Sequence, residues 1–249
     1  MPGQLGNRLM ERLRLLMFGG LTLRTGSETT TGASTRRHRL ALLALLAVAR
    51  DRGLHRDKIL AYFWPESDAQ HARHGLNQLL YFQRHHLDDG GLFLGKKTLR
   101  LNPAVITTEV WEFEDALDAG GNEAAVRLYA GPFLDGFFLR QAPEFERWVD
   151  EHRRRLEKRC AQAFMALARA AAGTGNQHQA LSWWRRAAEL NPFDSETARH
   201  VIETALALGD RAAALRHAHE HADLLRTELS LDPDPAVMQL IDRVRGSSG

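Results

Sequence analysis

The sequence predicts a mainly α-helical protein with a small β component, in which a front part of hairpins and helices precedes a rear part of helical repeats. Three observations support this prediction. Glycine-centred hairpin signals flank the front part, helical periodicity fills the space between them, and a 34-residue repeat occupies the rear. The 249 residues are enough for two modest domains, each with its own core.

The front part begins with LRLLMFGGLTLR at residues 13–24, which reads as two short strands around Gly19-Gly20 and is followed by a polar loop over residues 25–35. Helical periodicity follows in three segments separated by Gly53 and Pro65, namely residues 34–50, 54–64 and 69–87. Residues 92–102 then predict a second hairpin around Gly95. Two helices joined by a short turn and followed by a hairpin are in the order of a winged helix-turn-helix.

The rear part, from residue 103 onward, reads as helical and repeats itself. Residues 173–190 and 206–225 superpose with a constant offset of 34, which pairs Gly175 with Gly209, Asn176 with Asp210, Ala180 with Ala214, Leu181 with Leu215 and Leu190 with Leu224. This offset is the period of tetratricopeptide helical hairpins, where a small residue after the turn lets the paired helices approach. Residues 119–129 form a weaker echo about 55 residues before the first copy.

These elements divide the chain into a flexible N-terminus, a winged-helix domain, a tetratricopeptide-like domain and a tail, at residues 1–12, 13–102, 103–245 and 246–249. The charge distribution follows the same division. Residues 1–102 hold sixteen basic and eight acidic side chains, whereas residues 103–249 hold seventeen and twenty-three. A basic front joined to an acidic rear predicts an anionic partner for the front domain alone.

The predicted helix over residues 69–87 separates into two arcs at about 100° per residue. One arc is aliphatic, with Gln83 as a polar intruder, and consists of Ala69, Ala72, Leu76, Leu79, Leu80 and Leu87. The opposite arc has neither aliphatic nor acidic residues and consists of Gln70, Arg73, His74, Asn77, Gln78, Tyr81, Arg84 and His85. Asn and Gln suit the edge of adenine, and Arg suits guanine or phosphate. A solvated face that happens to be basic is the alternative.

The candidate DNA contacts extend beyond this helix. On the helix they are Arg73, His74, Asn77, Gln78, Tyr81 and Arg84. Lys96 and Lys97 at the hairpin tip can reach a phosphate or a minor groove, although lysines at turns are usually only solvated. Arg36 and Arg37 lie near a helix N-terminus, where cations oppose the helix dipole, and either a phosphate partner or simple exposure explains them.

The sequence gives little support for an enzymatic activity or a metal site. There is no HExxH, no GxSxG and no glycine-rich phosphate loop, so no catalytic residue, metal or cofactor is predicted. His217 and His221 have the i,i+4 spacing of metal ligands, but no third ligand is placed, and such histidines are usually on the surface. The carboxylates of residues 109–118 read as a solvated acidic helix, and one of Trp183 and Trp184 is expected to face away from the core, where it can anchor a partner.

The location of the protein follows from what the sequence lacks. Cys160 is the single cysteine, which excludes an internal disulfide. The longest apolar run, residues 40–49, is about half of what a membrane span requires. The N-terminus mimics a signal peptide only faintly. We therefore expect a cytoplasmic protein without membrane contact.

At this point the sequence resembles a known family, the bacterial transcriptional activator domain (BTAD) regulators, which include the Streptomyces antibiotic regulatory proteins. The resemblance covers residues 13–245 and rests on LRLLMFGGLTLR, RHRLALLALLA, DKILAYFWPESDAQHARHGLNQLLYFQRHHL, LRLNP, LYAGPFLDGF, APEFERWVDEHRRRLEKR and ELSLDPDPAV. It implies an OmpR-type winged helix that binds direct-repeat promoter DNA through helix 69–87. The rear domain would serve dimerisation and contact with RNA polymerase. Two positions depart from the family pattern, Phe82, where relatives have a small residue, and Gln83, where they have leucine.

The sequence therefore predicts a sequence-specific DNA-binding transcriptional regulator of double-stranded promoter DNA, rather than an enzyme. The resemblance implies an activator that binds as a homodimer. A protein-interaction module, in which both domains bind protein partners without reading DNA, is the alternative. A metal hydrolase is the third functional class considered. The sequence leaves open the operator, the regulated genes, the upstream signal, whether the protein activates or represses, and its oligomeric state. It also leaves open the roles of Phe82 and Gln83 and whether the chain is complete.

Overall fold

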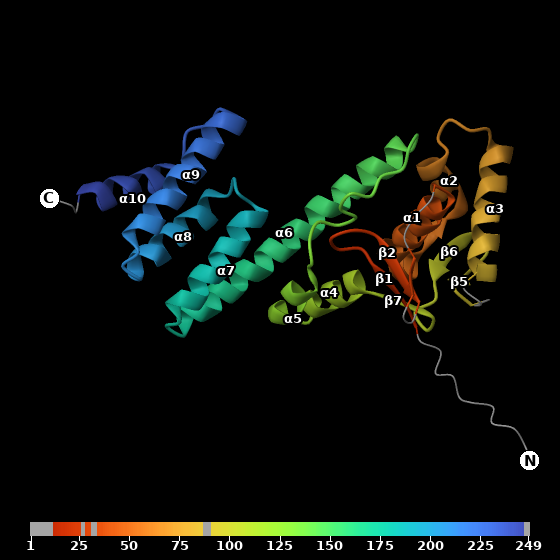
Figure 1. Ribbon diagram of the computed structural model, residues 1–249, viewed down its shortest axis with the longest axis horizontal. Coiled ribbons are helices and arrows are strands. Elements are labelled where there is room, and N and C mark those ends of the chain that lie inside the picture. The colour runs from red at the N-terminus through yellow and green to blue at the C-terminus, as the bar shows by residue number, and fades with distance from the viewer. Residues whose placement is uncertain (1–11, 26–27, 31–33, 87–90, 247–249) are drawn as a thin grey trace, which may run out of the picture. The chain divides into compact units, whose positions relative to one another are not determined.

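The computed structural model describes residues 12–25, 28–30, 34–86 and 91–246 (Figure 1). This part of the chain is mainly helical with short strands, and the predicted fold class, a winged helix followed by a helical domain, is confirmed. It divides into two compact units. The first comprises residues 1–115 and 128–153, and the second comprises residues 116–127 and 154–249. Within the described ranges, no helix combines the length and apolar character needed to span a membrane.

A four-stranded sheet opens the first unit, in the order β3-β2-β1-β7. Its strands are β1 (Leu13–Leu16), β2 (Thr22–Thr25), β3 (Glu28–Thr30) and β7 (Ile106–Thr108). The β1–β2 hairpin is the one that the sequence predicts, and its inward residues Leu13, Leu15 and Leu23 are buried. β1 also pairs in parallel with β7.

Two of these strands correct the sequence analysis. β3 lies within residues 25–35, which were expected to be a loop, and β7 lies in the part expected to be helical throughout. Both strands have only three residues, which is too short to show an alternating pattern. The partner of β7 is more than ninety residues earlier in the chain, so no local signal announces the pairing.

The rest of the first unit contains the winged helix. Its helices are α1 (Ser34–Ala49), α2 (Arg56–Phe63) and α3 (Ala69–His86), with a 3₁₀ turn η1 (Arg50–Arg52) after α1. The wing is a three-stranded sheet in the order β4-β6-β5, formed by β4 (Leu54–His55), β6 (Thr98–Leu101) and β5 (Phe93–Leu94). The apolar run expected to be a buried helix is buried without interruption from Leu40 to Ala47.

Two contacts fix the position of α3. Gly75 lies against Trp64, and a Cβ at this position would be 2.9 Å from the Trp64 ring, so a larger residue would push the helix away from α2. Gln83, the polar intruder of the aliphatic arc, is only 4% exposed and donates from Nε2 to the carbonyl of Arg39 on α1 at 3.1 Å. The amide is therefore a buried, satisfied contact between α3 and α1.

Phe82, the other departure from the family pattern, lies outside this packing. Its ring is 40% exposed, next to Tyr81 at a centroid distance of 6.0 Å. The guanidinium of Arg39 lies 6.0 Å from the centre of the Phe82 ring. The Arg39 guanidinium thus lies within cation–π range of the partly exposed Phe82 ring.

The acidic helix α4 (Glu109–Asp118) provides a further correction, because it is not fully solvated. Glu109 is 5% exposed, and its Oε1 accepts hydrogen bonds from the backbone N–H groups of Met17 and of Phe18, the latter at 2.8 Å. Burial raises the pKa of Glu109, whereas the two N–H donors oppose that effect. β7 delivers the first turn of α4 to the β1–β2 hairpin, a placement that depends on long-range pairing.

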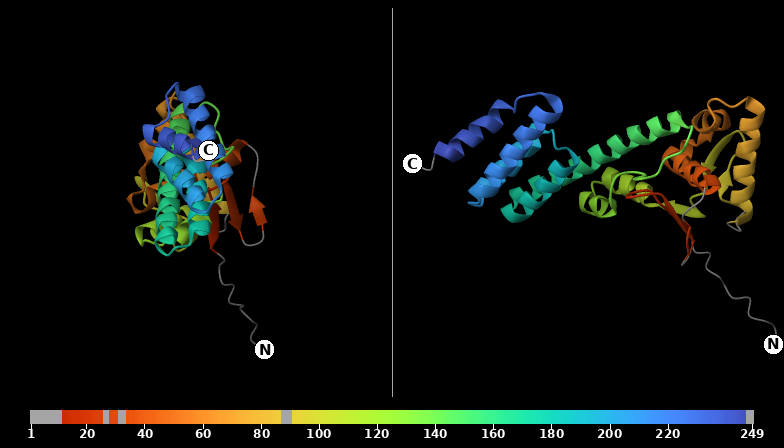
Figure 2. Two further views of the ribbon diagram at one scale, coloured as in Figure 1. Left: turned by 90° about the vertical axis from the view of Figure 1, so that its left-hand side faces the viewer. Right: turned by 45° about the horizontal axis from the view of Figure 1, so that its top comes forward.

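The second unit is a helical array. It contains α5 (Asn122–Leu128), most of α6 (Pro143–Gly173), and the helices α7 (Gln177–Leu190), α8 (Ser195–Ala207), α9 (Arg211–Leu229) and α10 (Pro235–Gly246). The helices α7 to α10, coloured cyan to blue, pack side by side (Figure 2). Their core includes Ala180, Trp184, Val201, Ile202, Ala214, Val237 and Leu240.

The predicted repeat is present in the backbone hydrogen bonds of three turns, centred on Gly120, Gly175 and Gly209. In each turn the glycine has a φ between 77° and 79°. The N–H group of the glycine donates a hydrogen bond to the carbonyl three residues before it. The N–H group of the following residue donates to the carbonyl four residues before the glycine. The carbonyl of the glycine accepts a hydrogen bond from the N–H group two residues after it. The 34-residue repeat and its weaker echo at residues 119–129 therefore share one turn geometry. Asn176 and Asp210 also cap the following helices in the same way, by accepting from the N–H three residues on.

Replacing Glu109 by alanine should destabilise the protein by about 2–4 kcal/mol, because two buried N–H groups lose their acceptor. Chemical denaturation of the full chain measures this change. Glu112→Ala is the matched control, since Glu112 pairs with Arg14 at 2.7 Å on a half-exposed surface, and such pairs contribute about 0–1 kcal/mol. Equal losses in the two variants would show that the Glu109 contact is not a structural requirement.

Glu109→Gln should show a pH-dependent difference from the wild type. A carboxyl whose pKa is raised by folding stabilises the protein while it is protonated, and this contribution is lost as the pH rises through the folded-state value. The free energy of unfolding of the wild type, minus that of Glu109→Gln, should therefore fall as the pH rises from about 4.3, the ordinary pKa of glutamate, toward neutral. Denaturation curves across this range test it, and a rising difference would contradict it.

Candidate nucleic-acid interface

The exposed side of α3 carries the polar residues that the sequence places there. Arg73, His74, Asn77, Gln78 and Tyr81 are all exposed, and Tyr81 is 58% exposed. The other side of the helix is buried, through Ala72, Leu76, Leu79, Leu80 and Gln83. Ala69 is an exception to the predicted arc, because it is exposed in the first turn of the helix. The separation of the two sides gives α3 a continuous polar surface without a carboxylate between Gln70 and Gln83.

A hollow of about 500 Å³ lies between α2, α3 and the tip of the wing, and we call it the wing hollow. It is lined by His55, Arg56, Asp57, Leu60, Arg73, Leu76, Asn77 and Lys97. The hollow thus brings together Arg73, Asn77 and Lys97, which the sequence had assigned to two separate elements. Lys96 is exposed next to Lys97 but is not among the lining residues.

The wing hollow is predominantly basic. Arg56, Arg73 and Lys97 contribute three positive charges, and Asp57 contributes a negative charge next to His55, with Oδ2 and Nδ1 3.3 Å apart. In the part of the chain that the structure describes, neither Arg73 nor Lys97 has a carboxylate within 4.0 Å. Cations that lie close together without acidic partners are suited to a phosphate or to the acceptor atoms of a base.

Arg56 is a functional candidate that sequence reasoning missed. It is the first residue of α2, directly after the two-residue strand β4, and its Nη2 donates a hydrogen bond to Oδ1 of Asn77. Its position in an amphipathic helix gave no signal. Arg56 becomes a candidate only through the pairing of β4 with β6, because this pairing places the start of α2 beside the wing.

The amide and imidazole groups of α3 also interact with one another. Gln78 Nε2 lies 2.9 Å from His74 Nε2, and since the amide nitrogen can only donate, the imidazole nitrogen accepts. At the start of the helix, Oδ1 of Asp68 accepts from the N–H groups of Gln70 and His71, both at 3.0 Å. Asp68 therefore caps α3. Its carboxylate also pairs with the ring of His71, so the position of this histidine is explained by a side-chain partner and does not require a metal.

The remaining candidates do not join this surface in the described residues. Arg37 donates to the carbonyl of Phe138 at 3.1 Å, and its guanidinium lies 4.7 Å from the centre of the Phe138 ring. Arg37 thus holds another segment of the first unit. The side chains of Arg36 and Arg84 lie outside the described residues, so their predicted contacts stay predictions.

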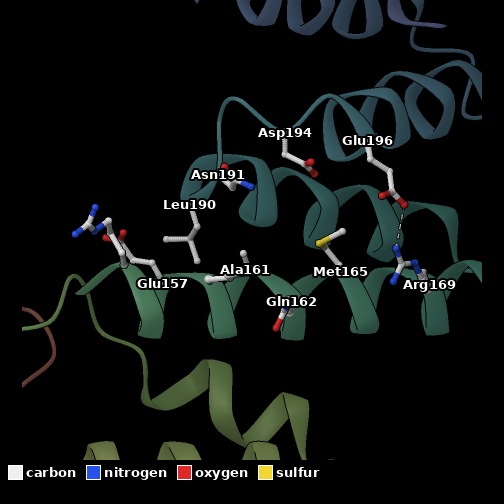
Figure 3. A pocket seen from close by; sticks show the side chains of 11 residues that line it. Glu157, Ala161, Gln162, Met165, Arg169, Leu190, Asn191, Asp194 and Glu196 are labelled. Carbon is white, nitrogen blue, oxygen red and sulfur yellow. Dashed lines mark hydrogen bonds and ion pairs between the residues drawn. The ribbon is translucent and has the colours of Figure 1, made fainter. Parts of the chain in front are cut away.

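The second unit has a groove of about 570 Å³ between α6 and the start of α8, which we call the rear groove (Figure 3). Its charged lining residues are Arg154, Glu157, Lys158, Arg169, Asp194 and Glu196, and its apolar ones are Ala161, Met165 and Leu190. Arg169 and Glu196 form an ion pair across the groove at 3.2 Å. A surface of mixed charge with an apolar floor is suited to a polypeptide partner.

His221 and the two tryptophans of the repeats are more buried than the sequence predicts. His221 is buried rather than on the surface, and its ring nitrogens lie 3.0 Å from the Pro192 carbonyl and 3.3 Å from Ser195 Oγ. Within the described chain, no cluster of three or more metal-ligating side chains is found. Trp184 is buried and Trp183 stacks on Phe164 at 5.7 Å, half-buried against the core, so neither is a free anchor. Packing of both faces of α7 explains this difference.

Comparisons with known proteins agree with this architecture. The chain has 22% sequence identity to the structure titled Mycobacterium tuberculosis EmbR in complex with low affinity phosphopeptide, with a TM-score of 0.68. The similarity covers 96% of this chain and 66% of that one, so this chain spans a little under two thirds of its length. A search of curated proteins gives no match. Residues 113–245 match the family described as bacterial transcriptional activator domain. Because this match covers more than half of the chain, the protein belongs to the bacterial transcriptional activator domain family of transcriptional regulators.

Proposed function

We propose that this protein is a sequence-specific DNA-binding regulator, in which α3 enters the major groove of promoter DNA. The observation that carries the proposal is the acid-free exposed side of α3, continuous with the basic wing hollow. An α-helix fits the major groove, and Arg, Asn and Gln are side chains that bind base edges there. Arg73, Asn77 and Gln78 are the candidates for base contact, with His74 and Tyr81 beside them.

The wing and the flanking cations would hold the DNA backbone. Lys96 and Lys97 are exposed at the tip of the β5–β6 hairpin, and the start of α2 lies across the wing hollow from α3. Contacts to phosphate set the position of a protein on the duplex, whereas contacts to base edges select the sequence. Arg36 and Arg84 belong to the same proposal as further candidates for backbone contact.

We propose that the family's activator role is exerted through the second unit, by recruitment of RNA polymerase and without chemistry on the DNA. The rear groove supports this proposal, because it offers cations, carboxylates and amides around an apolar floor. Binding as a homodimer to direct repeats would place two copies of α3 on one face of the duplex. The alternative, a module that binds only proteins, predicts no affinity for DNA even at low salt.

Asn77→Ala should relax the sequence preference of the protein, because it removes a side chain that contacts base edges. We expect selected sites to lose about tenfold of their preference at one base pair, while affinity for nonspecific DNA is unchanged. Selection from randomised duplexes, followed by fluorescence anisotropy on the selected sites, measures both quantities. An unchanged preference would remove Asn77 from the reading surface.

Lys97→Ala should weaken binding to every sequence by a similar factor, because the lost contact is to the DNA backbone. The slope of log K against log salt concentration should fall by about one. Lys158→Ala, which removes the same charge from the second unit, is the control and should leave the slope unchanged. The proposal for the wing fails if both variants have the wild-type slope.

Lys158→Glu should weaken binding of the full chain to purified bacterial RNA polymerase, because it reverses a charge in the rear groove. The loss should be on the order of fivefold, as expected for a partly exposed charge. DNA binding should be unaffected, whereas Lys97→Ala should show the opposite pattern. Biolayer interferometry with each partner separates the two effects, and equal polymerase binding by all three proteins would exclude the rear groove as the contact.

A further inference from the structure

Arg56 and Asn77 form a pair that bridges α2 and α3 inside the wing hollow. The Nη2 group of Arg56 donates to Oδ1 of Asn77, and both residues line the hollow together with Arg73 and Lys97. Asn77 is exposed at the centre of the polar side of α3, whereas Arg56 is partly buried at the start of α2. The contact therefore fixes which end of the Asn77 amide faces outward.

An asparagine side chain has an acceptor oxygen and a donor NH₂ group. Reading adenine uses both at once, because the oxygen accepts from N6 and the nitrogen donates to N7. With Arg56 bound to Oδ1, the NH₂ group is the end of the Asn77 amide that has no hydrogen-bond partner among the described residues. A second donor that approached Oδ1 would meet the positively charged guanidinium next to it. The amide is thus presented as a donor.

The surroundings of the pair strengthen this polarity. The other N–H groups of Arg56, together with Arg73 and Lys97, are donors without any acceptor capacity. Asp57, the carboxylate of the hollow, lies next to His55 at 3.3 Å. Gln78, on the same side of α3, shows the contrast, because its nitrogen is engaged by His74 and its Oε1 stays available as an acceptor.

We propose that Arg56 is a specificity-determining residue, which turns Asn77 into a donor and makes this position of α3 select guanine rather than adenine. In the major groove, guanine presents two adjacent acceptors, N7 and O6, and no donor. The NH₂ group of Asn77 and a neighbouring N–H of Arg56 supply two donors side by side. This inference rests on the proposed function, since it assigns a base to a helix that is proposed to read DNA.

A matched set of variants of the full chain tests the role of Arg56. Arg56→Met keeps the length of the side chain but removes its donors, which releases Oδ1 of Asn77. Arg56→Lys keeps a donor and the charge. Arg52→Met removes a charge from the same unit at an exposed position outside the wing hollow. Asn77→Ala identifies which base pair of the selected site faces this position.

Selection from randomised duplexes gives the base preference of each variant. At the base pair that loses its preference in Asn77→Ala, the wild type, Arg56→Lys and Arg52→Met should select guanine. Arg56→Met should select adenine there, with a reversal of preference of about tenfold or more. Denaturation curves of each variant confirm that the chain is folded.

Three outcomes would overturn the inference, and they differ from one another. If Arg56→Met still selects guanine and only binds more weakly with a smaller salt slope, Arg56 is a phosphate contact. If the wild type already selects adenine at this position, the amide is not held as a donor. If the wild type binds no DNA at low salt, the proposed function itself fails, and the assignment of guanine fails with it.

Discussion

The packing of α3 against α1 and α2 is the constraint on which the candidate interface depends. A helix can present a polar side to a ligand only when its other side is held in one orientation. Here the orientation is set by the close approach of Gly75 to Trp64 and by the hydrogen bond of Gln83 to the Arg39 carbonyl. A rotation of α3 by one residue would expose part of the buried aliphatic arc and withdraw Asn77 from Arg56. The contacts on the inner side thus determine the chemistry of the outer side.

A similar dependence joins the opening sheet to the helices that follow it. Glu109 accepts two backbone N–H groups from the β1–β2 hairpin, while the strand before it pairs in parallel with β1. A buried carboxylate is costly unless donors surround it, so its position is strongly constrained. This single side chain connects the start of the chain with the start of α4. The winged helix is therefore completed by residues well beyond its last wing strand.

The sequence predicted those parts of the structure that depend on local pattern. Helical periodicity identified α1, α2 and α3 to within a few residues, and the glycine-centred turns located both hairpins and the repeat. The short strands β3, β4 and β7 were not predicted, because a strand of two or three residues has no periodicity of its own. The roles of Arg56 and Glu109 were not predicted either, because each side chain contacts a partner that only the pairing of these short strands brings close. The exposed candidates of α3 were placed correctly on one side, but their hydrogen bonds to one another could not be read from a helical projection.

The two units are interleaved along the chain, which constrains how the protein can be synthesised and divided. The first unit includes residues 128–153, which follow the first segment of the second unit, residues 116–127. Residues 128–153 supply buried aromatic side chains, namely Phe133, Phe145 and Trp148. A ribosome that has released only the wing has therefore not yet released the whole core of the unit to which the wing belongs. Folding during translation must wait for the first part of α6. A truncation after the wing would likewise produce an incomplete core rather than an independent DNA-binding fragment.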